Sequence, residues 1–252
     1  MEFRKIFDTI PEQFDKYRPR YSEELFADLI SYAEIKPGKK VLELGPGTGQ
    51  ATEPILNTGC SYHAIELGEH LADMMKSKYG KCANFDIVNA DFITHDFGNQ
   101  KLDMIYSAAT IQWIPEDIAF QKTFDLLKPG GVLAMLLTKA DYETPNEKLY
   151  NKIQQVYSAY FKPDIEYKHG SFVYSNAVNY GYVDFEKREY HDKRELTTDE
   201  YVAFCGTHCD HIVLSEPYKS NFYDGIRGAV NETGGKVIFF DTYEMYLAKK
   251  PL

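Results

Sequence analysis

The sequence has few cysteines and fewer basic than acidic residues, and each shortage excludes a class of protein. Four cysteines scattered over 252 residues are too few for a disulfide framework, so we expect reduced thiols. Lys and Arg total 28 against 38 Asp and Glu, and the resulting net charge of −10 repels a polyphosphate backbone. We therefore expect no nucleic-acid partner.

Long apolar runs are missing as well. No stretch approaches the roughly 20 apolar residues that cross a bilayer, and Met1–Lys5 leads into no signal-like apolar segment. We therefore expect no membrane partner and a cytoplasmic location. A chain of this length can bury one large core, so we predict a single domain over residues 1–252.

A glycine-rich turn follows a short apolar strand in the run Val41-Leu42-Glu43-Leu44-Gly45-Pro46-Gly47-Thr48-Gly49-Gln50. Glycines let the backbone approach a ligand, and the helix that follows offers unpaired N–H groups. A dinucleotide fingerprint needs glycine where Gln50 stands, and a pyrophosphate gains nothing from a nearby Glu43. S-adenosylmethionine has no phosphate and carries two cationic groups that a carboxylate can face. A tight turn without a ligand has the same pattern, so the residues downstream decide.

Further candidate contacts follow the next two predicted strands. Glu66 ends the strand that begins at Tyr62, in the place of an acceptor for ribose hydroxyls. Asp91 and Phe92 end the next one, and a carboxylate beside an aromatic ring suits an adenine. Strands and helices alternate up to about Thr138, which predicts parallel strands with ligands beyond their carboxyl ends.

These motifs resemble, in order, those of class I S-adenosylmethionine-dependent methyltransferases over roughly residues 38–138. The resemblance implies an α/β fold: a Rossmann-like, doubly wound, seven-stranded, mostly parallel sheet with an antiparallel last strand and a helical cap. It implies a cofactor-binding core at 35–138, cap elements at 1–34 and 139–232, and the last strand at 233–252. It places Glu43, Gly45 and Gly47 at the methionine end of S-adenosyl-L-methionine, Glu66 at the ribose, Asp91 and Phe92 at the adenine and the Ser107 carbonyl at the ammonium, with Gly49 and Leu67 also among the cofactor contacts.

Two shorter segments are similar to the small-molecule branch that includes trans-aconitate methyltransferase-like enzymes. They are Tyr17-Arg18-Pro19-Arg20-Tyr21 and Ile111-Gln112-Trp113. From them we predict that the acceptor is bound by Tyr17, Arg18, Tyr21, Gln112 and Trp113. The alternatives are ordinary surface arginines and a core tryptophan.

The function that the resemblance implies is methyl transfer to a small molecule by in-line displacement, and we expect an oxygen acceptor. Ser107-Ala108-Ala109-Thr110 lacks the Asn/Asp-Pro-Pro-aromatic sequence of enzymes that methylate base amino groups. A non-catalytic cofactor-binding module and a protein methyltransferase stay open as alternatives. A nicotinamide-dependent oxidoreductase is disfavoured by Glu43 and Gln50.

The segment Cys205-Gly206-Thr207-His208-Cys209-Asp210-His211 resembles a metal site but lacks ligands from a second segment, so we predict no metal. If the segment is helical, Tyr201, Cys205 and His208 form one stripe and His211 points elsewhere. We expect His208 to line the acceptor pocket as a hydrogen-bond donor or base. The alternative is a partly buried histidine with a backbone partner.

The remaining expected elements follow from periodicity and capping signals. Ser22 to Glu34 has the spacing of an amphipathic helix. Capping boxes at 144–147 and 197–200 predict two helix starts, and a third helix should follow Ser215-Glu216-Pro217. Residues 182–190 and 236–247 are typical of strands.

Overall fold

Seven strands form one sheet in the computed structural model, which describes residues 2–165 and 171–252. The strands are β1 (Lys40–Leu44), β2 (Ser61–Glu66), β3 (Phe85–Asn89), β4 (Leu102–Ala108), β5 (Leu127–Asp141), β6 (Val183–Thr197) and β7 (Lys236–Lys249). They lie in the order β3-β2-β1-β4-β5-β7-β6. The pairs within β1 to β5 are parallel, whereas β7 is antiparallel to both β5 and β6. The predicted Rossmann-like sheet with an antiparallel last strand is confirmed.

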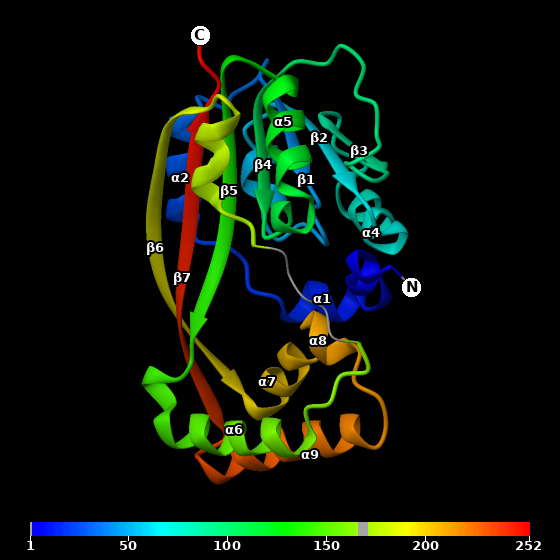
Figure 1. The fold of residues 1–252 in the computed structure, drawn as a ribbon, viewed down its shortest axis with the longest axis vertical. Helices are drawn as coiled ribbons and strands as arrows, with labels where there is room; N and C mark the ends of the chain where they lie inside the picture. Colours follow the sequence, from blue (N-terminus) through cyan, green and yellow to red (C-terminus); the bar gives the residue numbers. More distant parts are fainter. Residues whose placement is uncertain (1, 166–170) are drawn as a thin grey trace.

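Helices cover both faces of the sheet (Figure 1). The α-helices are α1 (Pro11–Tyr17), α2 (Glu23–Tyr32), α3 (Thr52–Leu56), α4 (Glu69–Tyr79), α5 (Glu116–Leu126), α6 (Glu147–Tyr160), α7 (Thr198–Cys205), α8 (Cys209–Ile212) and α9 (Tyr218–Glu232). Short 3-10 helices are η1 (Phe3–Thr9), η2 (Ile111–Trp113), η3 (Thr144–Asn146) and η4 (Tyr174–Tyr180). One buried cluster joins α2 and α3 to the sheet, and another joins α5 and η4 to its opposite face. None of the described helices is both long and apolar enough to cross a membrane.

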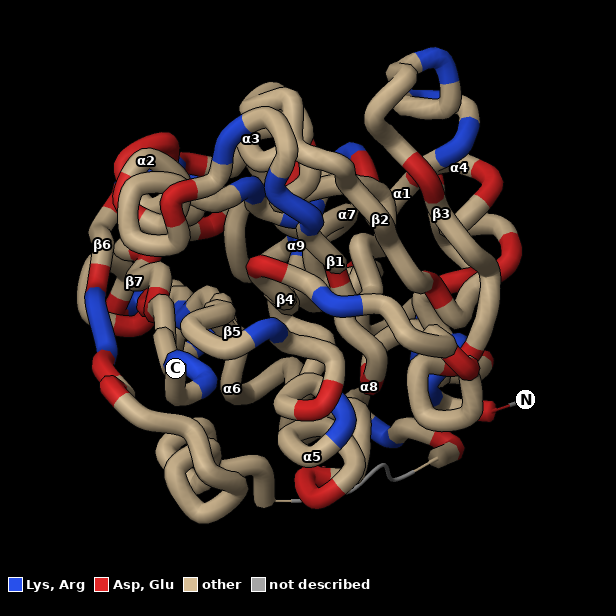
Figure 2. Tube along the Cα trace, turned by 90° about the horizontal axis from the view of Figure 1, so that it is seen from above, with Lys and Arg blue, Asp and Glu red and all other residues tan. Residues whose placement is uncertain are grey.

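Strands β5, β6 and β7 extend well beyond the parallel strands and carry α6, α7 and α9 at their far end (Figure 1). A third buried cluster fills this end, with Ile153 of α6, Phe222 and Ile226 of α9 and Phe239 of β7. Helices α1 and α8 lie between this end and the parallel strands. Seen from above, acidic and basic positions are interspersed along the trace (Figure 2).

Strand β6 is longer than the sequence predicted, because it continues from the expected end near Tyr190 to Thr197. It is the edge strand, paired only with β7 among the described residues, and most of its side chains are exposed. Charged residues are tolerated at such an edge, so the apolar alternation that marks a strand is missing. The start and end of β7 lie within two residues of the prediction.

Only one of the two predicted capping boxes forms. The Thr197 hydroxyl accepts from the Glu200 backbone N–H, and the Glu200 carboxylate accepts from the Thr197 backbone N–H, as predicted for the start of α7. The box predicted at 144–147 is wrong, because α6 begins at Glu147 after η3 and its N-cap Asn146 makes no capping bond. The Asn146 amide instead joins Tyr142 to Ile238 of β7. The helix predicted over Ser22 to Glu34 is confirmed as α2.

Candidate functional site

A cavity of about 470 Å³ lies beyond the carboxyl ends of the parallel strands, where ligands bind in open α/β sheets. Its walls come from the turn after β1, the ends of β2, β3 and β4, the N-terminal segment, η2 and the start of α8. The predicted site residues that line it are Arg18, Tyr21, Gly45, Gly47, Glu66, Leu67, Asp91, Phe92, Gln112, Trp113 and His208. The structure thus brings predicted cofactor positions and predicted acceptor positions to the same cavity.

The glycine turn borders the cavity with its backbone. Gly45 and Gly47 both have φ of 59°, a region that side chains rarely adopt. A Cβ at Gly45 would lie 2.3 Å from Cγ2 of Thr110, and one at Gly47 would lie 3.3 Å from the Phe14 ring. The close packing therefore leaves room for glycine alone at Gly45, and the turn exposes backbone rather than side chains.

Glu66 links this turn to the end of β2. Its two carboxylate oxygens accept from the backbone N–H groups of Gly47 at 3.0 Å and Gly68 at 2.9 Å. Burial raises the pKa of the Glu66 carboxyl to about 7, although these backbone donors act in the opposite direction. A carboxylate has about four acceptor positions, so lone pairs remain for a ligand after these two bonds. Glu66 can therefore fix the turn and still accept hydrogen bonds from the cavity.

Asp91 at the end of β3 is bonded to the N-terminal segment. Arg4 donates to both of its carboxylate oxygens, at 3.1 and 2.7 Å. The hydrogen bond from Arg4 lowers the pKa of Asp91, against the effect of burial. Phe92 is buried beside it, with the Lys122 ammonium 5.1 Å from its ring centre. Sequence reasoning missed Arg4, because a seven-residue 3-10 helix carries no periodicity that marks its inner face.

Three of the predicted cofactor residues do not line the cavity: Glu43, Gly49 and Ser107. The Glu43 side chain points to the opposite face of the sheet from Leu42 and Leu44, because successive side chains of a strand alternate. There its carboxylate accepts from Thr52 at 2.6 Å and from the Tyr62 hydroxyl. Ser107 is fully buried, and its hydroxyl accepts from the Ile111 N–H at 2.8 Å. Glu43 is therefore placed in the core, where the prediction had put it at the methionine end.

Arg18 also lines the cavity, just after α1. Its guanidinium lies over the rings of Phe7 and Phe14, 5.7 and 5.3 Å from their centres. One N–H group donates to the Thr207 carbonyl at 2.5 Å, and the buried Nε has no hydrogen-bond partner among the described residues. Burial lowers the pKa of Arg18 to about 10. Arg18 is therefore a desolvated cation whose Nε–H group can still donate a hydrogen bond.

Gln112 and Trp113 reach the cavity from η2, after β4. The Oε1 atom of Gln112 is buried and has no donor among the described residues. Trp113 packs edge-on against Phe7, with ring centres 5.8 Å apart. Tyr21 also lines the cavity, whereas Tyr17 packs against the far-end cluster of α6, α7 and α9 and does not.

His208 occupies the turn between α7 and α8 and lines the same cavity. Its Nδ1 lies 3.2 Å from the Cys205 carbonyl, so Nδ1 carries the hydrogen and Nε2 is left as an acceptor. Burial, together with the nearby charge of Arg18, lowers the pKa of His208 to about 3. At neutral pH this imidazole is uncharged and accepts a hydrogen bond more readily than a proton.

Two predictions about this segment are wrong. Helix α7 ends at Cys205, so His208 does not continue a helical stripe with Tyr201. His211 does not point elsewhere, because its ring centre is 5.1 Å from that of His208. Both errors come from extending one helix through Gly206, which ends it. In the part of the chain that the structure describes, no group of three or more His, Cys, Asp or Glu could hold a metal.

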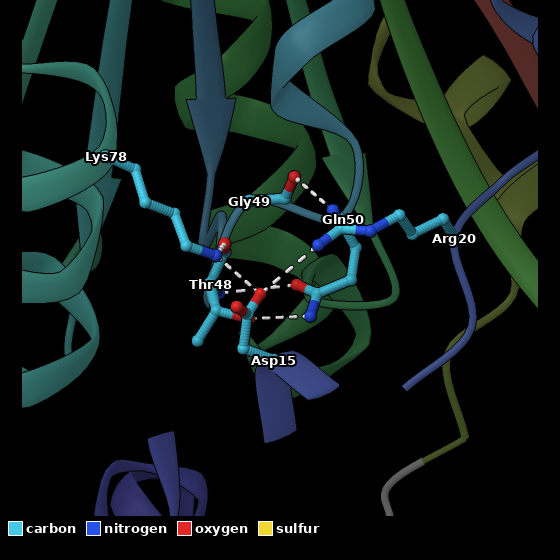
Figure 3. Close-up of polar contacts among 6 residues, drawn as sticks. All are labelled: Asp15, Arg20, Thr48, Gly49, Gln50 and Lys78. Atoms are coloured by element: carbon cyan, nitrogen blue, oxygen red, sulfur yellow. Dashed lines mark hydrogen bonds and ion pairs between the residues drawn. The ribbon is translucent and has the colours of Figure 1, made fainter. Parts of the chain in front are cut away.

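A network of polar contacts ties the N-terminal segment to the glycine turn (Figure 3). The Asp15 carboxylate of α1 accepts from Lys78 of α4 at 2.5 Å and from Arg20 at 3.3 Å. Lys78 also donates to the Thr48 carbonyl at 2.7 Å, and Arg20 to the Gly49 carbonyl at 3.2 Å. Asp15 thus holds two cations against the outer side of the turn.

Comparison with known families agrees with this site. Residues 42–135 match the model of a family described as a methyltransferase domain. The match covers the glycine turn and the strands that end at the cavity. Residues 42–135 thus match a methyltransferase domain, and the sheet order with its antiparallel β7 is that of the class I methyltransferase fold.

Individual relatives are distant. Ribosomal RNA small subunit methyltransferase A of Borreliella burgdorferi (strain ZS7) is 28% identical over 148 residues, which cover 56% of this chain and 51% of that protein. The chain thus spans about half the length of the curated relative it matches.

Solved structures resemble the whole chain. Haemonchus contortus phosphoethanolamine N-methyltransferase 2, in complex with phosphomonomethylethanolamine and S-adenosylhomocysteine, has a TM-score of 0.60 and 16% identity, over 100% of this chain and 61% of that one. The [4+2]-cyclase SpnF has a TM-score of 0.53 and 12% identity, over 91% of this chain and 81% of that one. At these identities the likeness shows the fold alone.

Proposed function

We propose that this chain transfers the methyl group of S-adenosylmethionine to an oxygen atom of a small-molecule acceptor. The observation that carries the proposal is the shared cavity, which is lined both by the glycine turn and Glu66, here called the cofactor end, and by Arg18, Gln112 and His208, here called the acceptor end. A methyl group passes directly from donor to acceptor, so both must lie in contact in a single enclosed site.

The cofactor end fits S-adenosylmethionine. Gly45 and Gly47 present backbone without side chains, Glu66 offers free lone pairs for ribose hydroxyls, and Phe92 offers an apolar wall for the adenine. Asp91 can contact the adenine only where Arg4 leaves it an open acceptor position. When bound, the cofactor supplies an electrophilic methyl group on a positively charged sulfur.

The acceptor end positions a nucleophile rather than forming a covalent bond to it. The buried Oε1 of Gln112 and the Nε2 of His208 can each accept a hydrogen bond from an acceptor hydroxyl. Such bonds orient an oxygen lone pair, and near-attack geometry in a dry site contributes roughly 7 to 11 kcal/mol. Phe7, Phe14 and Trp113 exclude water on this side.

A small acceptor fits better than a nucleic acid or a protein. The cavity's volume of about 470 Å³ suits a cofactor and a compact partner. The relative that methylates ribosomal RNA shares only part of this chain, and this chain is acidic with interspersed charges (Figure 2). The two segments similar to the small-molecule branch supply Arg18, Tyr21, Gln112 and Trp113 to the cavity. SpnF shares the fold and is a cyclase, so the activity must be tested directly.

The test is release of S-adenosylhomocysteine from S-adenosylmethionine with a panel of small acids, phenols, alcohols and amines. We expect release with an acid, phenol or alcohol, and a product whose methyl group mass spectrometry and NMR place on oxygen. The control is Gly45→Val, whose side chain would overlap Thr110 and close the turn. Release that requires ribosomal RNA or a basic peptide would contradict the proposal.

A further inference from the structure

The chain has six arginines, and among the described residues Arg18 alone lacks a carboxylate partner. The paired ones are Arg4 with Glu2 and Asp91, Arg20 with Asp15, Arg188 with Asp28 and Glu186, Arg194 with Asp241, and Arg227 with Asp199. Arg20 and Arg227 are largely exposed and could have remained solvated without a partner. The arginine without a carboxylate is instead one whose Nε is buried.

Arg194 shows what a buried arginine in this fold normally has. Its guanidinium lies 4.8 and 4.4 Å from the ring centres of Phe204 and Phe239, much as Arg18 lies over two phenylalanines. Arg194 nevertheless donates from two of its nitrogens to Asp241, which is fully buried. Arg18 likewise lies over two aromatic rings and donates to a backbone carbonyl, but it has no carboxylate partner that corresponds to Asp241.

No neighbouring group in the described chain takes the place of that anion. Asp210 lines the same cavity and its charge acts on Arg18, but the two make no ion pair among the described residues: the Asp210 carboxylate lies 3.2 Å from Nδ1 of His211, and its side chain is 53% exposed. The other arginine at the cavity, Arg4, is satisfied by Asp91, and no lysine is among the described lining residues. A buried charge without a counter-ion is costly, and an anionic ligand removes that cost.

We propose that Arg18 is an anion-binding residue and that the acceptor is a small monocarboxylate whose apolar body also carries the hydroxyl from which Gln112 and His208 accept. This inference rests on the proposed methyl transfer. A carboxylate supplies both the missing acceptor for Nε–H and the missing negative charge. A single unpaired cation matches one negative charge, so a monoanion fits better than a phosphate dianion. Phe7, Phe14 and Trp113 give the apolar body its walls.

Trp113 makes the proposal measurable, because it is the only tryptophan of the chain and lines the cavity. The experiment titrates benzoate, hexanoate and the neutral benzamide into protein saturated with S-adenosylhomocysteine and follows Trp113 fluorescence. We expect a carboxylate to saturate at millimolar concentration and benzoate to bind roughly tenfold to a hundredfold tighter than benzamide. In Arg18→Gln this preference should vanish, and Arg18→Lys should keep part of it.

Lys16→Gln is the matched control, because it removes one positive charge from exposed α1 surface two residues away. It should keep the full preference for benzoate. Unchanged S-adenosylhomocysteine affinity in Arg18→Gln shows that the variant is folded. If that affinity is lost, the preference for benzoate is judged from Arg18→Lys alone. Equal binding of benzoate and benzamide overturns the proposal, as does a preference that survives in Arg18→Gln or the failure of both carboxylates to saturate below about 50 mM.

The two proposals fail separately. A carboxylate preference that depends on Arg18, with no acid, phenol or alcohol methylated, keeps the anion site and removes the methyl transfer. Methylation of a neutral phenol by a protein that shows no carboxylate preference keeps the methyl transfer and removes the anion site.

Discussion

Glu43 and Glu66 are two buried carboxyl groups with the same raised pKa and different surroundings. Burial raises the pKa of each to about 7. Glu66 faces the cavity between two backbone N–H groups, whereas Glu43 lies on the other face of the sheet with Thr52 and Tyr62. One of its oxygens has no hydrogen-bond partner among the described residues. We therefore expect Glu43 to affect the stability of the folded protein and Glu66 to affect the conformation of the glycine turn.

Glu43 should make folding pH-dependent. Because its folded pKa is about 7 against an ordinary 4.5, its contribution to stability is present below pH 4.5 and is lost as the pH rises through 7. Glu43→Gln mimics the protonated form, so from pH 5 to pH 8 its free energy of unfolding should rise relative to wild type by roughly 1 to 3 kcal/mol. Urea denaturation at both pH values measures this. The exposed Glu24→Gln is the control, and a parallel pH dependence in Glu43→Gln and wild type would show that Glu43 does not titrate in this range.

From residue types and their order along the chain, we could predict which residues line the cavity more easily than which atoms each of them contacts. The structure puts Arg18, Gln112 and His208 at the cavity, where the order of the motifs along the chain had led us to expect them. Glu43 was misplaced because a motif does not state which face of the strand a side chain takes. Arg4 could not have been found, because its partner Asp91 is 87 residues away and nothing local signals the pair.

At the scale of elements, the N-terminal segment forms one wall of the cavity and is held by ion pairs at several points. Arg4 of η1 binds Asp91, and Asp8 accepts from the Leu71 N–H at the start of α4. Asp15 of α1 completes the series at the glycine turn (Figure 3). The wall is thus fastened to the rest of the cavity by polar side chains as well as by apolar contacts, such as buried Ile6 and the packing of Phe7 on Trp113.

Asp15→Ala should weaken cofactor binding without changing the cavity lining. Lys78 and Arg20 would lose the carboxylate that holds them against the Thr48 and Gly49 carbonyls. A partly exposed pair is worth about 1 kcal/mol, so affinity for S-adenosylhomocysteine should fall roughly threefold to tenfold by calorimetry. Asp73→Ala, which removes an exposed ion pair with Lys76 on α4, is the control. Equal affinities of the two variants would mean that the contacts of Asp15 do not support the turn.

Elements with a strong local signal were predictable, and elements decided by tertiary context were not. The capping box at Thr197 and the apolar face of α2 were found because their signals lie within one turn of helix. The second half of β6 was missed because pairing with β7, rather than its charged sequence, makes it a strand. The break between α7 and α8 was missed because a single Gly206 ends a helix only when packing allows it.

At the scale of the whole molecule, the cavity lies between the parallel strands and the far end carried by β5, β6 and β7 (Figure 1). The family model covers residues 42–135, which hold the predicted cofactor contacts together with Gln112 and Trp113, whereas Arg18 and His208 lie outside it. This division is why the sequence predicts a cofactor more precisely than an acceptor. Cofactor contacts recur in a fixed order, whereas acceptor contacts come from parts of the chain that differ between proteins of one fold.

We infer that this cavity binds S-adenosylmethionine and serves methyl transfer rather than hydride transfer. The most direct measurement is a calorimetric titration of the purified protein, without added metal, with S-adenosylhomocysteine and in parallel with NADH. We expect saturable binding of S-adenosylhomocysteine at one site per chain and no heat from NADH. Saturable NADH binding with no response to S-adenosylhomocysteine would contradict it.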